Sequence, residues 1–139
     1  MNAKEESLLR RIEENVNGCT VEICSLKSTG QSGRQSYGLI CLRGAGFVMA
    51  SVKITRTAQV GLTAEEIAFH MSMTAMGCPS VILVQIHPLG TTKTSAASLR
   101  LYTGSQVEDL YYRGTEVAGI DQWPLDAIQW HLLRWRLIE

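Results

Sequence analysis

The sequence predicts a single α/β domain, with a mixed central sheet of about five strands flanked by three or four helices. The chain has 139 residues, the usual length of one domain. Residues 36–42, 47–54 and 80–86 are apolar runs of strand length. A helix-like segment lies between the last two runs, and a strand–helix–strand succession normally forms a right-handed crossover between parallel strands.

The composition excludes a membrane-spanning or strongly basic protein. Hydrophobic residues make up 45% and charged residues 19% of the chain, as in ordinary globular domains. The formal net charge is zero, yet residues 1–60 hold eight basic and five acidic residues. A local basic face in this half therefore stays open. The N-terminus carries charges of both signs, unlike a signal sequence, and we expect a cytoplasmic protein.

The first half of the chain is predicted to hold one helix followed by three strands. Leu8, Ile12 and Val16 recur at helical spacing, and Asn17-Gly18 behind them is typical of a helix end. Apolar runs separated by Gly-containing turns indicate the strands. The predicted elements are a helix at 4–16, strands at 20–26, 36–42 and 47–54, a polar loop at 27–35 and a hairpin turn at 43–46.

The second half shows two helix-start signals of the capping-box type, in which a Ser or Thr precedes a Glu by three residues. Thr63 with Glu66 starts the crossover helix, and Ser105 with Glu108 starts a short helix. Pro124 suits the first turn of a last, Trp-rich helix at about 124–138. The remaining predicted elements are strands at 80–86 and 98–102, a polar loop at 87–97 and helix ends at Gly77 and Gly114.

One polar residue stands out in the apolar strand at 47–54: Lys53. The predicted elements follow the order helix, three strands, helix and strand. Short motifs mark these elements: Tyr37-Gly38-Leu39-Ile40, the turn Gly44–Gly46, Phe47-Val48, Ser51-Val52-Lys53-Ile54-Thr55, Leu62–Glu66, Gly77, Val81–Val84 and Leu99–Tyr102. In this order and these motifs the chain resembles the PD-(D/E)XK nuclease superfamily, particularly its phage VRR-Nuc and Holliday-junction-resolvase-like members. The resemblance covers roughly residues 5–115 and implies a restriction-endonuclease-like αβββαβ core of phage or prophage origin.

The resemblance implies Lys53 as a catalytic residue, together with a helical acid at Glu6 or its neighbour Glu5. Nucleases of this kind hold Mg²⁺ between strand carboxylates, and these positions fall on Gly38 and Ser51 here. Neither residue supplies the charged oxygen ligands that Mg²⁺ prefers. We therefore expect remnants of a catalytic site, no metal site and no cofactor.

The expected function is that of a catalytically inactive nuclease-fold protein that binds DNA or a nucleic-acid-processing protein, for instance as an inhibitor of host defence. One alternative is an active Mg²⁺-dependent endodeoxyribonuclease or junction resolvase with displaced metal ligands. Another is a structural or interaction subunit. A phosphate-contacting rim is expected at the basic residues of loops and strand ends, with scattered surface charge as the alternative: Lys27, Arg34, Arg43, Lys53 and Arg56.

The remaining candidate residues are expected to have structural roles. Ser51 would need a nearby base to act as a nucleophile, and the sequence names none. Glu22 could replace a lost metal ligand, but we expect it on the exposed face of an edge strand. Among the histidines, His70 is expected to face solvent or a partner, His87 to support a loop, and His131 to lie in the core or an interface.

The cysteines, methionines and tryptophans are expected in packing or in an interface. Four scattered cysteines without zinc spacing predict buried, reduced thiols. The crossover helix is expected to bury Ile67 and Met71, with Met73 and Met76 also in packing. Three tryptophans cannot easily share one face of one helix, so a homodimer through the Trp123–Trp135 region is expected.

Overall fold

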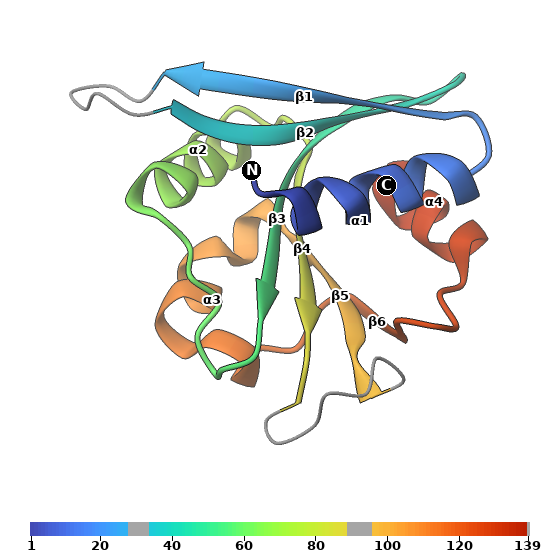
Figure 1. Cartoon of the computed structure of the whole chain (residues 1–139). Coiled ribbons are helices and arrows are strands. Elements are labelled where there is room, and N and C mark those ends of the chain that lie inside the picture. The colour runs from blue at the N-terminus through green and yellow to red at the C-terminus, as the bar shows by residue number, and fades with distance from the viewer. Residues whose placement is uncertain (28–33, 89–95, 139) are drawn as a thin grey trace.

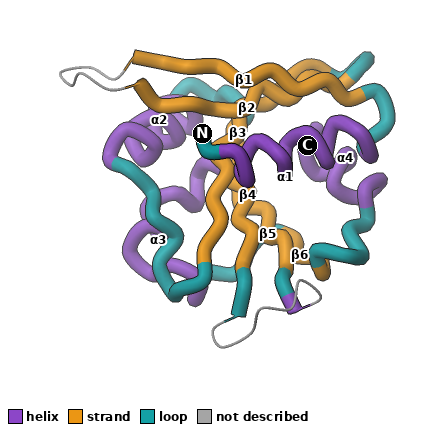
Figure 2. The backbone as a smooth tube through the Cα atoms, viewed as in Figure 1, coloured by secondary structure: helices purple, strands orange, loops and turns teal. Residues whose placement is uncertain are grey.

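The computed structural model describes residues 1–27, 34–88 and 96–138, without the side chains of Lys27 and Arg34, and shows an α/β fold (Figures 1 and 2). The predicted loops at 27–35 and 87–97 lie mostly outside the described residues. A six-stranded sheet is flanked by helices on both faces. The strands are β1 Cys19–Lys27, β2 Arg34–Leu42, β3 Gly46–Thr55, β4 Ser80–Ile86, β5 Ser98–Thr103 and β6 Asp121–Pro124; the helices are α1 Ala3–Asn15, α2 Ala64–Ala75, α3 Val107–Arg113 and α4 Trp130–Ile138.

The sheet is mixed, as predicted, and its strands are ordered β1-β2-β3-β4-β5-β6. Neighbouring strands run antiparallel except β3 and β4, which run parallel and are joined through α2. The parallel crossover predicted between these two strands is therefore confirmed. The described part of the sheet has one strand more than the expected five, because the short β6 pairs with β5.

The side chains of β3 point alternately to the two faces of the sheet, and each face carries its own helical layer. Val48, Ala50 and Val52 belong to the core that α1 and α4 cover. The residues between them point to the opposite face, where α2 and α3 pack, because successive strand side chains alternate. Helices α1 and α2 therefore lie on opposite faces of the sheet, and this separation decides which functional side chains can meet.

Helix α1 also protects the open edge of the sheet. An exposed edge strand offers unpaired backbone groups to other chains. The backbone N–H of Val21 in β1 donates to Glu13 Oε2 (2.6 Å), and Arg10 Nη1 donates to the Val21 carbonyl (2.8 Å). This backbone hydrogen bond lowers the pKa of Glu13. Glu22 is exposed on this edge strand, as expected.

The predicted apolar stripe of α2 is correct only for Ile67, which is partly buried against the core. The fully buried residues of this helix are Glu66 and His70, whereas Met71 and Met76 are exposed, Met76 by 67%. The helix does begin with the predicted capping box of Thr63 and Glu66. A polar face of α2 is turned to the sheet because β3 presents polar residues there, which periodicity of apolar residues cannot reveal.

The C-terminal segment differs from the predicted helix at 124–138. Pro124 ends β6, and α4 begins only at Trp130. Trp123 is buried and donates its indole N–H to Gln129 Oε1 (3.3 Å), while Trp130 is half-buried. Trp135, expected in the apolar stripe, is 59% exposed. A four-residue edge strand tolerates proline at its end, so the proline marks the strand rather than a helix start.

Three smaller expectations also need correction. A capping box of Thr103 with Gln106 precedes α3, two residues before the predicted Ser105 and Glu108. The four cysteines are free, but Cys78 is exposed and the other three are only partly buried. His131 is exposed on α4, which excludes the expected core position and leaves the expected interface a prediction. Within the described residues, no helix has the length and apolar character to cross a membrane.

Gly114 provides a test of the packing between α3 and the segment after β3. Its φ is +58°, and an added Cβ would lie 1.9 Å from the Ala58 carbonyl oxygen. We expect Gly114→Ala to lower the free energy of unfolding by ~3 kcal/mol, since backbone strain and a clash combine. Gly44→Ala is the matched control, because φ there is +78° with open space around it; ~1 kcal/mol is expected. Equal losses in urea unfolding would contradict this account.

Candidate functional site

The candidate site centres on an ion pair between the sheet and the crossover helix. Lys53 projects from β3 toward α2, where its Nζ pairs with Glu66 Oε1. The side chain of Glu66 is 1% exposed and that of Lys53 is 14% exposed. An ion pair shielded from water in this way is strong only if further hydrogen bonds satisfy its atoms.

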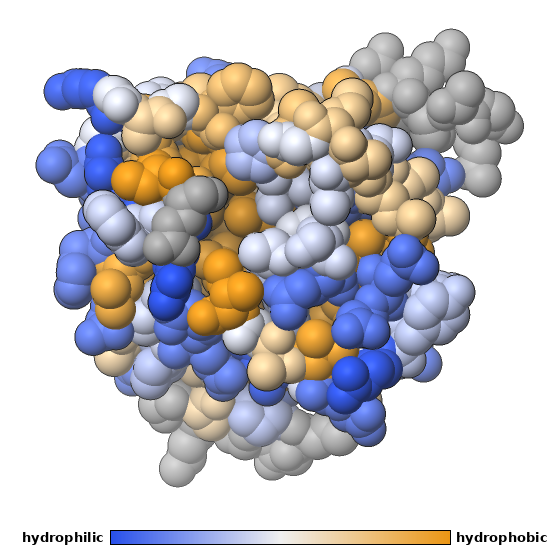
Figure 3. Space-filling view, turned by 180° about the vertical axis from the view of Figure 1, so that it is seen from behind, coloured by the Kyte–Doolittle hydropathy of each residue, from blue (hydrophilic) through white to orange (hydrophobic). Residues whose placement is uncertain are grey.

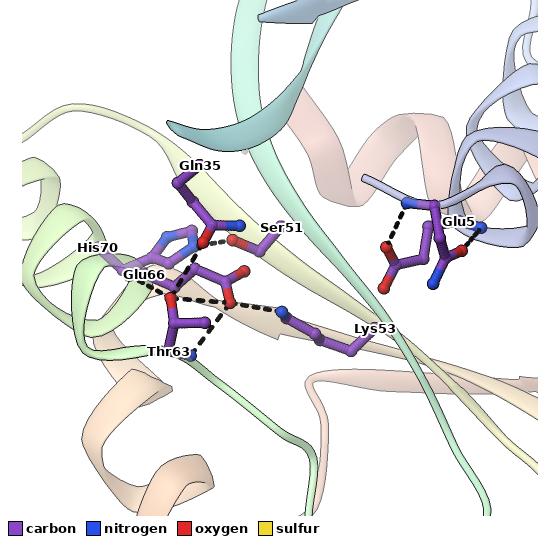
Figure 4. A network of polar contacts seen from close by, with 8 residues as sticks. Glu5, Gln35, Ser51, Lys53, Thr63, Glu66 and His70 are labelled. Carbon is purple, nitrogen blue, oxygen red and sulfur yellow. Dashed lines mark hydrogen bonds and ion pairs between the residues drawn. The ribbon is translucent and has the colours of Figure 1, made fainter. Parts of the chain in front are cut away.

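Glu66 receives those hydrogen bonds from the start of α2. Its Oε1 accepts from the backbone N–H of Thr63 (3.1 Å), and the Thr63 hydroxyl accepts from the Glu66 N–H (3.1 Å). The same hydroxyl lies 3.1 Å from Gln35 Oε1, which connects the cap to β2 (Figure 4). One carboxylate therefore caps the helix and neutralises Lys53, so both links bind α2 to the sheet.

A second polar chain lies one helical turn further along α2. His70 Nε2 lies 2.7 Å from Ser51 Oγ on β3, and His70 Nδ1 lies 2.9 Å from Ser80 Oγ at the start of β4. All three side chains are buried. Burial lowers the pKa of His70 to about 4, although the Glu66 charge raises it; the Lys53 charge acts in the same direction as burial. His70 is therefore neutral near pH 7, with one ring nitrogen donating and the other accepting.

Ser51 and His70 have the spacing of a nucleophile and its base, but both are fully buried. A substrate cannot reach them in this conformation, so the contact acts as a cross-link between strand and helix. The expected solvent-facing position of His70 is wrong. The signal that was missed is the spacing of four between Glu66 and His70, which places two polar residues on one helix face, opposite Ser51 and Lys53.

The structure separates the two positions assigned to metal-binding carboxylates. An added Cβ on Gly38 would lie 2.8 Å from Leu9 Cδ1 of α1, so this position faces α1. Ser51 faces α2, where it contacts His70. Carboxylates at these two positions would point to opposite faces of the sheet and could not share one cation. The expectation that they form one pair is therefore corrected.

The helical acid is also placed away from Lys53. Glu6 lies on α1, where it forms an ion pair with Arg10 (3.8 Å). Glu5 closes the cap of α1 with Asn2, and Figure 4 shows it across the β3 ribbon from Lys53. The structure brings neither acid to Lys53. In the described part of the chain, no group of three His, Cys, Asp or Glu residues is arranged to hold a metal ion.

Two arginines of the predicted basic rim lie far apart. Arg43 lies in the turn before β3 and Arg56 just after it, and a ten-residue strand at roughly 3.3 Å per residue separates them by ~30 Å. Lys53 is paired with Glu66. Lys27 and Arg34 face each other in the β1–β2 register, but their side chains are outside the described residues.

Comparisons with protein-family profiles, curated proteins and solved structures gave no significant match to this chain.

The ion pair predicts a characteristic pattern of stabilities. Lys53→Met leaves the buried Glu66 carboxylate without its partner, and we expect a loss of about 3 kcal/mol in the free energy of unfolding. Lys53→Met combined with Glu66→Gln removes both charges, and stability is expected to return to within ~1 kcal/mol of the wild type. Urea unfolding of the two single variants and the double variant measures the coupling. Additive losses would show that the two side chains do not interact.

His70 predicts a dependence of stability on pH. The pKa of His70 is about 4 when folded, against about 6.5 for an unperturbed histidine. Between these values the unfolded chain binds the additional proton, so stability falls as pH is lowered from 6.5 to 4. We expect His70→Gln to flatten this decline in unfolding experiments. His131→Gln, at an exposed position, is the control and should leave the slope unchanged; a flattening in both variants would contradict the assignment.

Proposed function

We propose that this protein has a PD-(D/E)XK-like core without nuclease activity, and that it acts by binding DNA or a nucleic-acid-processing protein. The order α1, β1, β2, β3, α2, β4 and the motif stretch around Lys53 support the fold assignment. The observation that supports the missing activity is the ion pair of Lys53 with the buried Glu66. A phage or prophage origin and an inhibitory role remain parts of this proposal.

Metal-dependent phosphodiester cleavage needs a cation that activates water and a cationic group near the scissile phosphate. Here the lysine is neutralised by Glu66, and the neighbouring Ser51 is engaged by His70. Mg²⁺ binding at Glu66 would have to displace both the lysine ammonium and the helix cap. Each loss would weaken the attachment of α2 to the sheet, so the site is better suited to stability than to catalysis.

An interaction subunit is the second candidate, favoured by exposed apolar residues. In the view from behind, apolar side chains gather on the side where α4 lies (Figure 3). Phe47 is exposed by 57%, and it lines a hollow of about 310 Å³ with Pro79 and Ile138. Of the three tryptophans in the Trp123–Trp135 region, Trp135 is the one we propose for the contact surface of a homodimer. Trp123 is buried, and Trp130 contacts Arg11.

A cleavage assay tests the proposal directly. Linear and branched DNA are incubated with the purified protein and Mg²⁺ or Mn²⁺, and we expect no cleavage. Lys53→Ala and the double variant Lys53→Met/Glu66→Gln are the controls, and we expect the double variant to remain folded. Cleavage by a contaminating nuclease would persist in both variants. Metal-dependent cleavage that both variants abolish would overturn the proposal in favour of an active nuclease.

A further inference from the structure

A hollow of about 220 Å³ lies between α1 and the ends of β3 and β4, on the face of the sheet opposite Lys53. It is lined by four residues of α1 and by two strand residues: Lys4, Ser7, Leu8, Arg11, Ile54 and Gln85. The N-terminal half of α1 lies beside β3 here (Figure 1). Leu8 and Ile54 make part of the wall apolar, and Lys4 and Arg11 supply positive charge, whereas no acidic residue contributes to this lining.

The charge pattern of α1 explains why its acids do not reach the hollow. Lys4 and Arg11 are seven residues apart and lie on the same helix face. Three acids of the helix are engaged elsewhere: Glu5 binds the Asn2 backbone, while Glu6 and Glu13 pair with Arg10. Lys4 and Arg11 therefore border the hollow without these three acids beside them.

Two further basic groups come from the strand ends beside the hollow. Arg56 and His87 directly follow Thr55 and Ile86, which are paired at the ends of β3 and β4, and the His87 backbone N–H donates to the Thr55 carbonyl (2.9 Å). Both residues therefore lie close to the strand residues Ile54 and Gln85 of the hollow. Burial lowers the pKa of His87, and the positive charges of Arg56 and Lys4 act in the same direction. His87 Nε2 lies 2.7 Å from Gln85 Nε2, and an accepting Nε2 leaves the proton on Nδ1 as a free donor.

Arg11 is held in position by an aromatic contact. Its guanidinium carbon lies 5.3 Å from the centre of the Trp130 ring, a cation–π arrangement that covers one face of the group. The N–H edge of a stacked guanidinium remains available for two parallel hydrogen bonds to a phosphate. Among the described residues, Lys4, Arg11 and Arg56 have no acidic partner within 4 Å.

We infer that Lys4, Arg11, Arg56 and His87 form a binding site for a phosphate group. Three basic side chains without acidic partners and one histidine N–H donor together match the oxygen atoms of a doubly charged phosphate. The hollow is smaller than the roughly 300 Å³ at which drug-sized ligand sites begin, so it takes a phosphate rather than a whole nucleotide. That this phosphate belongs to a nucleic-acid backbone rests on the proposed function. Free phosphate and mononucleotides carry the same chemical group.

The test uses the full-length protein and two probes. Binding of a fluorescent DNA oligonucleotide is followed by anisotropy at several salt concentrations, and inorganic phosphate and a mononucleotide are titrated while backbone amide NMR shifts are recorded. The variant is Lys4→Ala/Arg11→Gln/Arg56→Ala, and the control is Arg113→Gln, an exposed position on α3, on the other face of the sheet. Circular dichroism and unfolding curves confirm that both variants are folded.

We expect the triple variant to weaken DNA binding roughly tenfold or more and to reduce the salt dependence, whereas the control is unchanged. Phosphate-induced shifts should cluster in residues 4–11 and 85–87 and disappear in the triple variant. Phosphate or mononucleotide binding without DNA binding identifies a free ligand as the source. Equal effects in both variants, or no binding of any probe, would overturn the inference. The proposal of an inactive nuclease fold fails separately, through the cleavage assay.

Discussion

The contact between Lys53 and Glu66 is the interaction on which the described site depends. The Glu66 carboxylate has three roles. It caps the first turn of α2, it neutralises the charge of Lys53, and it is connected to β2 through Thr63. A buried charge left without a partner is strongly destabilising, so neither residue can change alone. The lysine that suggests catalysis is thereby committed to holding the crossover helix on the sheet.

A second buried polar network, formed by Ser51, His70 and Ser80, also attaches α2 to the sheet. Residue 104 next to this network must be a glycine, because an added Cβ would lie 2.0 Å from Ser80 Oγ. Polar groups buried in this way must be satisfied by one another, and each one is. Such a network specifies how the helix sits on the sheet, and it does so without the access to solvent that catalysis would require.

Much of the fold could be predicted from the sequence, because apolar strands and helix caps are local signals. Thr63 and Glu66 predicted the start of α2, and the strand at 80–86 was predicted with its observed bounds. The buried face of α2 could not be predicted, since Glu66 and His70 are buried only because Lys53, Ser51 and Ser80 meet them. The same limit applies to Gly38 and Ser51, whose opposite orientations depend on strand register. Pro124 misled for a different reason: proline suits both a first helical turn and the end of an edge strand.

The two faces of the sheet thus carry different chemistry. One holds a closed network around Lys53, and the other holds a basic hollow beside α1. We propose that the Lys53 site does not accept a catalytic metal ion, and paramagnetic broadening of NMR signals by Mn²⁺ is the most direct test. We expect no selective broadening of the amides near Ser51, Lys53 and Glu66. Saturable broadening centred on these residues and reversed by Mg²⁺ would contradict it.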